Sequence, residues 1–141
     1  MPSWDRLYLA ARLERDRHAV QILDCRILGI TAEKVIEHLA FEPDLIGLSV
    51  NIVNYGGSVK AAGILKRRFP PVPVVLGGPY PSSLPEEILR KHDEIDAVAV
   101  GEGEETMAEL GRRVGANGIF AGIDGIYFRN GEGVQRNPPG R

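Results

Sequence analysis

The chain has 141 residues, which is enough for one domain that buries a single core. Its net charge of −2 and its 26% of charged residues describe an ordinary surface, and no long block of one sign would suit nucleic acid or an anionic membrane. The single cysteine, Cys25, excludes an internal disulfide and an iron–sulfur cluster held by this chain alone. Because the sequence shows no secretory signal and no apolar run of transmembrane length, we expect a cytoplasmic protein without a membrane span.

Apolar runs alternate with helical patterns along most of the chain. The spacing of Trp4, Leu7 and Ala11 predicts a first helix over 4–16. Further helices are predicted over 31–41, 58–69, 83–92 and 104–114, and strands over 19–24, 44–50, 72–78 and 96–101.

Two of these helices carry start signals. Gly29 opens a turn into the helix over 31–41, where Thr31 is the expected N-cap and Val35 faces inward. Ser83 and Glu86 have the S-x-x-E spacing of a capping box, which predicts a helix start at that serine.

Four apolar, non-alternating strands separated by helices are typical of a parallel sheet covered on both faces, which is the doubly wound α/β architecture of flavodoxin-like and Rossmann-like folds. The tail departs from this pattern, because two strand-like runs over 125–137 flank Asn130-Gly131-Glu132-Gly133 and predict a β-hairpin. Pro138-Pro139 then predicts a stiff exit. We therefore expect an α/β domain over 1–124, followed by the hairpin and the start of a linker over 125–141.

Glycine is the anomaly of the composition, with 17 of 141 residues, because average proteins contain roughly 7%. The glycines gather after three predicted strands, and the carboxyl ends of parallel strands line the ligand crevice of such sheets. Tight strand-to-helix turns need glycine as well, but bare backbone also lets a bulky ligand approach closely. We predict the principal pocket at Ser49–Gly57, Gly77–Ser83 and Gly101–Thr106.

The stretch GEGEET, residues 101–106, imitates a dinucleotide phosphate loop. Its carboxylates argue against that function, because Glu102, Glu104 and Glu105 would repel a pyrophosphate and already complement the helix N-terminus. The sequence also has no P-loop motif. No aspartate lies close to Ser49 at the end of the second strand, which argues against a phospho-acceptor receiver domain.

Signals of catalysis are weak. His18, His38 and His92 are read as surface histidines, since nothing in the sequence places a serine, cysteine or carboxylate beside them as a triad or metal site requires. Cys25 is read as packed rather than reactive. We assign no catalytic and no metal-ligating residue.

With D-L-I-G-L-S, V-V-L-G-G-P, G-E-G-E-E-T and the closing hairpin with R-N-P-P taken together, the chain resembles the cobalamin-binding domain found ahead of radical S-adenosylmethionine enzymes, from about Pro2 to Pro139. The resemblance implies that the nucleotide tail of cobalamin lies between strands and that the corrin lies across the strand ends, facing a radical domain. The cofactor-binding residues it implies are Ser49, Val50, Asn51, Asn54, Gly77, Gly78, Pro79, Tyr80, Gly101, Glu102, Gly103, Glu105 and Thr106.

The sequence departs from this family in two places. Some cobalamin proteins use D-x-H-x-x-G after the first strand, whereas Asp24, Arg26 and Gly29 follow what would be the second strand, so this spacing is a coincidence. Relatives normally begin with an apolar strand, but Met1-Pro2-Ser3 leads directly into a helix, so we expect the first, central strand to be missing. Unpaired apolar strand edges would then favour a homodimer or larger assembly.

The expected function is therefore that of a cobalamin-binding domain that is not catalytic alone. It would present the corrin to a substrate held by a downstream radical domain, in an oxidoreductase or methyltransferase such as the anaerobic cyclase acting on magnesium-protoporphyrin ester. The iron–sulfur cluster and S-adenosylmethionine would belong to that other domain. The alternative is a non-catalytic interaction module of the same fold that has lost the cofactor.

Overall fold

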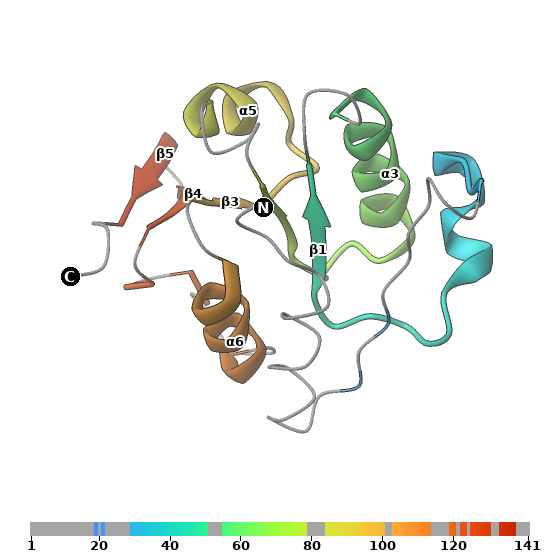
Figure 1. Cartoon of the computed structure of the whole chain (residues 1–141). Helices are drawn as coiled ribbons and strands as arrows, with labels where there is room; N and C mark the ends of the chain where they lie inside the picture. The colour runs from blue at the N-terminus through green and yellow to red at the C-terminus, as the bar shows by residue number, and fades with distance from the viewer. Residues whose placement is uncertain are drawn as a thin grey trace.

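A computed structural model of the chain describes most of the predicted elements (Figure 1). The described residues are 19, 21, 29–50, 55–78, 84–100, 103–113, 119–120, 122–123, 125–130 and 133–137. The predicted helix over 4–16 lies outside them, as does the predicted strand over 19–24 except for Ala19 and Gln21. The Gln21 side chain spans the end of the following helix, since its amide donates to the carbonyl oxygen of His38 at 2.7 Å and accepts from the N–H of Ala40 at 2.7 Å.

The described strands form one mixed sheet in the order β1-β2-β3-β4-β5. They are β1 (Ile46–Ser49), β2 (Val74–Gly77), β3 (Ala97–Ala99), β4 (Ile126–Asn130) and β5 (Gly133–Arg136). The pairings β1–β2 and β2–β3 are parallel, whereas β3–β4 and β4–β5 are antiparallel. The predicted α/β class and the predicted hairpin are confirmed, and the hairpin extends the same sheet. The division into 1–124 and 125–141 stays a prediction.

Helices cover both faces of the sheet, as the continuous apolar strands predicted. The 3-10 helix η1 (Ala32–His38) and the helices α3 (Tyr55–Arg68) and α5 (Pro85–Lys91) share one core cluster, while α6 (Gly103–Arg113) belongs to a second cluster. Successive residues of β2 point to opposite clusters: Val74 and Leu76 to the first, Val75 to the second. Figure 1 shows α3 and α6 on either side of the sheet.

Helix starts and types differ from the sequence-based predictions. The segment after Thr31 is a 3-10 helix that ends at His38, and Thr31 is its N-cap without a side-chain cap bond. The predicted capping box was wrong, because the N-cap of α5 is Leu84, with Pro85 in the first turn. Proline pre-sets the helical φ angle and needs no N–H partner at that position, so the helix begins there without a polar cap.

Arg129 of β4 joins the hairpin to the end of α5. Its Nη2 lies 2.6 Å from the carbonyl oxygen of Leu89, 3.0 Å from that of His92 and 3.0 Å from that of Ile95. The last carbonyls of a helix have no partner within the helix, and a cation there also complements the helix dipole. Arg129 therefore satisfies backbone groups that packing against β4 removes from water.

We predict that Arg129→Ala lowers the free energy of unfolding by about 2–4 kcal/mol, because a charged hydrogen-bond donor is lost and the part-buried carbonyls of Leu89 and Ile95 lose a partner. The matched control is Arg90→Ala. Arg90 lies on the exposed side of α5 and pairs with Glu86 at 3.1 Å, so its loss is expected to cost about 0.5 kcal/mol or less. Urea unfolding of both variants measures the difference; equal losses would contradict the role given to Arg129.

Candidate functional site

The carboxyl ends of the three parallel strands meet at one side of the sheet, which we call the carboxyl edge. Ser49 pairs with Gly77 across β1 and β2, and the N–H of Val50 donates to the carbonyl oxygen of Gly77 at 2.8 Å. The ends of these strands are therefore held in register directly before α3 and α5. The carboxyl edge also includes the end of β3 and the first turns of α3 and α6.

Gly78 is required by the packing of the carboxyl edge itself. Its φ angle is +109°, and a Cβ atom added there would lie 2.6 Å from the carbonyl oxygen of Val50 and 3.0 Å from its nitrogen. The missing side chain thus lets the chain after β2 lie against the chain after β1. The sequence assigned this glycine to ligand contact, and the structure supplies a second reason for it.

Among the described residues of the carboxyl edge, those in the first turn of α3 present bare backbone to open space. Gly56 and Gly57 are exposed, and a Cβ atom at either position would meet no atom within 4 Å. The first turn carries no acidic residue. Its N–H groups lack intrahelical partners and lie at the positive end of the helix dipole. A bulky, polar or anionic ligand group fits this turn.

The structure brings only part of the predicted cofactor site into view. Asn51, Asn54, Pro79, Tyr80, Gly101 and Glu102 lie outside the described residues. Gly103 and Glu105 lie in the first turn of α6, where only the backbone is described. The side chains of Val50 and Thr106 are 0% and 7% exposed, so the first packs in the core and the second is almost closed off from solvent.

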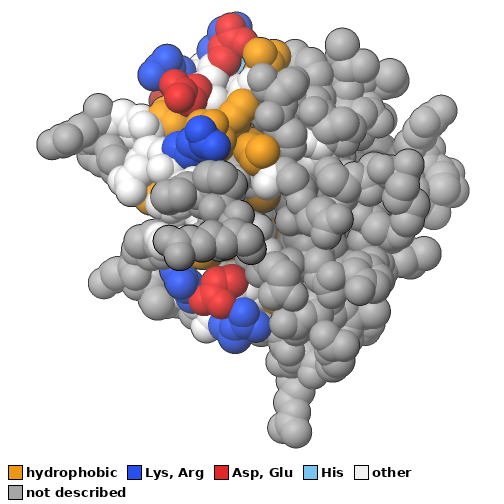
Figure 2. Space-filling view, turned by 60° about the vertical axis from the view of Figure 1, so that its left-hand side comes forward, with side chains coloured by type: hydrophobic (Ala, Val, Ile, Leu, Met, Phe, Trp, Pro, Cys, Tyr) orange, Lys and Arg blue, Asp and Glu red, His pale blue; other side chains and the backbone are white. Residues whose placement is uncertain are grey.

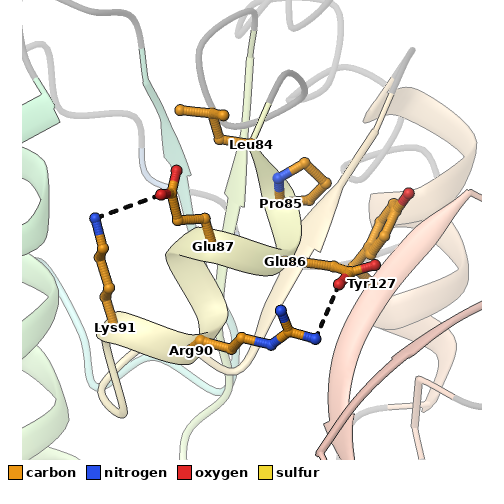
Figure 3. A pocket seen from close by; sticks show the side chains of 7 residues that line it. All are labelled: Leu84, Pro85, Glu86, Glu87, Arg90, Lys91 and Tyr127. Atoms are coloured by element: carbon orange, nitrogen blue, oxygen red, sulfur yellow. Dashed lines mark ion pairs between the residues drawn. The ribbon is translucent and has the colours of Figure 1, made fainter.

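A groove of about 570 Å³ lies between α5 and β4, beside the predicted pocket. It starts at Leu84, directly after the predicted segment over 77–83, and Tyr127 lines its far side (Figure 3). Its other lining residues are Pro85, Glu86, Glu87, Arg90 and Lys91. Figure 2 shows hydrophobic side chains gathered on this face between oppositely charged ones. Because most of the predicted segments lie outside the described residues, the position of the principal pocket stays a prediction.

Sequence reasoning missed the partners of His92. The hydroxyl of Tyr55 lies 2.9 Å from His92 Nε2, and His92 Nδ1 lies 3.0 Å from Glu94 Oε1. The structure thus places a carboxylate beside this histidine that the sequence analysis had not assigned to it. Tyr55 is the first residue of α3, so the contact ties the start of that helix to the residue after α5. Tyr55 and His92 are 37 positions apart in the sequence, which explains why no local pattern revealed their contact.

Two carboxylates among the described residues have pKa values below their ordinary range, and both shifts come from ion pairing. The hydrogen bond from Lys60 lowers the pKa of Glu33 and joins η1 to α3. Hydrogen bonds from Arg112 and Arg113 lower the pKa of Glu109 within α6. Stabilised carboxylate anions of this kind are solvated structural pairs, unlike the raised pKa of a general acid. Among the described residues, no group of three acidic, histidine or cysteine side chains is placed to hold a metal ion.

Comparison with known proteins gives the class to which this fold and this edge belong. The family model described as the B12 binding domain matches residues 2–111. The chain therefore belongs to the B12-binding domain family, and it is a cobalamin-binding domain similar to those of radical S-adenosylmethionine enzymes. In the part of the chain that the structure describes, no helix has the length and apolar character needed to cross a membrane.

Three relatives illustrate this class. The chain is 35% identical over 91 residues to the cobalamin-dependent radical SAM methyltransferase TokK of Streptomyces tokunonensis, covering 64% of this chain and 13% of that protein. It is 30% identical over 130 residues to the anaerobic magnesium-protoporphyrin IX monomethyl ester cyclase of a Synechocystis strain, covering 86% and 25%. The solved radical SAM methyltransferase TsrM from Kitasatospora setae, with cobalamin and a 4Fe–4S cluster bound, is 25% identical with a TM-score of 0.78, covering 95% and 25%. The chain thus spans a quarter or less of each.

We predict that Gly78→Ala lowers the free energy of unfolding by about 2–4 kcal/mol, because a left-handed conformation and a backbone clash both oppose the new Cβ atom. Gly122→Ala is the matched control. Gly122 also has a positive φ angle, +76°, but a Cβ atom there meets open space, so only the conformational cost of about 1–2 kcal/mol remains. Chemical denaturation compares the two, and a Gly78 variant no less stable than the Gly122 variant would refute the close packing of the carboxyl edge.

Proposed function

We propose that this chain binds cobalamin at the carboxyl edge and presents it to a substrate held by a radical S-adenosylmethionine domain. The observation that carries the proposal is the open glycine turn at the start of α3, on the carboxyl edge of a B12-binding domain sheet. A large cofactor needs bare backbone at a strand-end crevice, and this turn supplies it.

The described residues have different proposed roles in binding the cofactor. The backbone at Gly56 and Gly57 has room for a polar group of the ligand, while Val50 and Gly78 fix the strand ends beside it. Ser49 adds a hydroxyl at the end of β1. The remaining contacts are proposed for Asn51, Asn54, Pro79, Tyr80, Gly101, Glu102, Gly103, Glu105 and Thr106.

On this proposal the domain performs no reaction alone. Cobalamin, when bound, supplies a reactive cobalt centre, and the protein contributes position and exclusion of other ligands. The names of the relatives, two methyltransferases and a cyclase, indicate the range of reactions that the whole enzyme could carry out. The iron–sulfur cluster and S-adenosylmethionine are assigned to the radical domain. The single cysteine favours a reducing compartment, so we place the protein in the cytoplasm.

We predict that the purified chain binds hydroxocobalamin, and that Gly57→Leu weakens binding at least about tenfold, equivalent to roughly 1.4 kcal/mol. A Cβ atom at this position meets no atom within 4 Å, so we expect the leucine to occupy the open space at the first turn of α3 and to leave the fold intact. Gly63→Ala, later in the same helix, is the control and should leave the affinity unchanged. Absorbance titration measures both. A parent chain that folds but leaves hydroxocobalamin unbound would instead favour the cofactor-free interaction module.

We also propose that the chain self-associates, because any open edge of an apolar sheet of this kind favours pairing with a second copy. Sedimentation equilibrium at micromolar concentration should therefore show a homodimer or larger species. A folded monomer at 15.4 kDa with no tendency to associate would contradict this proposal.

A further inference from the structure

The C-terminal hairpin returns the chain to the carboxyl edge. β4 runs antiparallel to β3 with Ile126 beside Ala99, the last residue of β3. β5 then runs antiparallel to β4, and Arg136 lies beside Tyr127. The next residue, Asn137, is therefore level with Ile126 and with the end of β3.

Asn137 is held there by two hydrogen bonds. Its backbone N–H donates to the carbonyl oxygen of Ile126 at 3.0 Å, and its side-chain Nδ2 donates to that of Phe120 at 2.7 Å. The residue is 5% exposed, and only Thr106 shares its status as a buried polar residue in the described part of the chain. A buried amide yields little net stability, but its bonds fix one geometry because the unpaired alternatives are costly.

The turn that receives this bond is itself anchored to α6. Ile119 and Ile123 pack in the same core cluster as Met107 of α6. Arg113 Nη1, at the end of that helix, donates to the carbonyl oxygen of Ile119 at 3.2 Å. Asn137 thus connects the end of the hairpin to the helix whose first turn belongs to the carboxyl edge.

We propose that Asn137 is a positioning residue, which fixes the point and direction at which the chain leaves the domain at the carboxyl edge. Two prolines follow at Pro138 and Pro139, and proline fixes φ, so a set direction would persist beyond the hydrogen bonds. A domain that followed in the sequence would therefore be directed over the carboxyl edge. The claim that such a domain would meet cobalamin at this edge rests on the proposed function. The geometry of the exit is independent of it.

Spin-label distances test the exit without any cofactor. Arg141→Cys provides one label, and the other is placed at Leu84 or at Asp93, two exposed positions that flank α5. Leu84 is on the side of Tyr127, and Asp93 is on the side of Arg129, which bonds the carbonyl of His92. In a Cys25→Ser background, we expect the label at 141 to lie closer to 84 than to 93, with narrow distance distributions.

Asn137→Ala and the nearly isosteric Asn137→Asp should broaden both distributions, while Gln135→Ala, an exposed amide on the same strand, should not. Thermal unfolding verifies that each variant is folded. If Asn137 had a merely structural role, its variants would lower the unfolding midpoint and leave the distances unchanged, and this result would overturn the proposal. A label at 141 that lies no nearer to 84 than to 93 in the parent chain would also overturn it. Separate titration of the variants with hydroxocobalamin tests the proposed function, so the two failures are distinguishable.

Discussion

The parallel pairing of β2 with both β1 and β3 is the constraint on which the rest of the structure depends. All four residues of β2, Val74–Gly77, are buried, because crossovers between parallel strands place helices over the sheet. The same pairing brings the strand ends together at the carboxyl edge, where Gly78 must lie against Val50. The fold and the candidate site therefore share one cause, and a substitution that disturbs the strand ends affects both.

The sheet was predictable because its signals are local. Val74-Val75-Leu76 is apolar at consecutive positions, which a strand buried on both faces requires, and the turn over 130–133 has hairpin composition. Helix starts were less predictable. Tyr55 begins α3 before the predicted start at residue 58, and its hydroxyl bonds a histidine that is distant in the sequence. Leu84 caps α5 although its side chain offers no hydrogen bond.

The position of the candidate site stays a prediction, and the function of each of its glycines could not be predicted, because glycine serves two purposes at strand ends. Gly78 is required by the neighbouring backbone, whereas Gly57 faces open space, and nothing in the sequence separates the two cases. Asn137 was likewise interpreted only as part of the segment that leaves the hairpin. Its partner Phe120 lies 17 positions earlier, and only the antiparallel return of β5 brings the two together.

In the proposed function cobalamin binds at the carboxyl edge, whereas the opposite edge of the sheet, where Lys66 pairs with Asp96 at 2.7 Å, has a structural role. Paramagnetic relaxation measured by NMR tests this most directly, with cob(II)alamin as the broadening agent and hydroxocobalamin as the diamagnetic reference. We expect selective broadening of the amides at 55–58, at Gly77–Gly78 and at 103–106, with sharp signals at Lys66 and Asp96. Broadening centred on the groove between α5 and β4, or on the Lys66–Asp96 side, would contradict it.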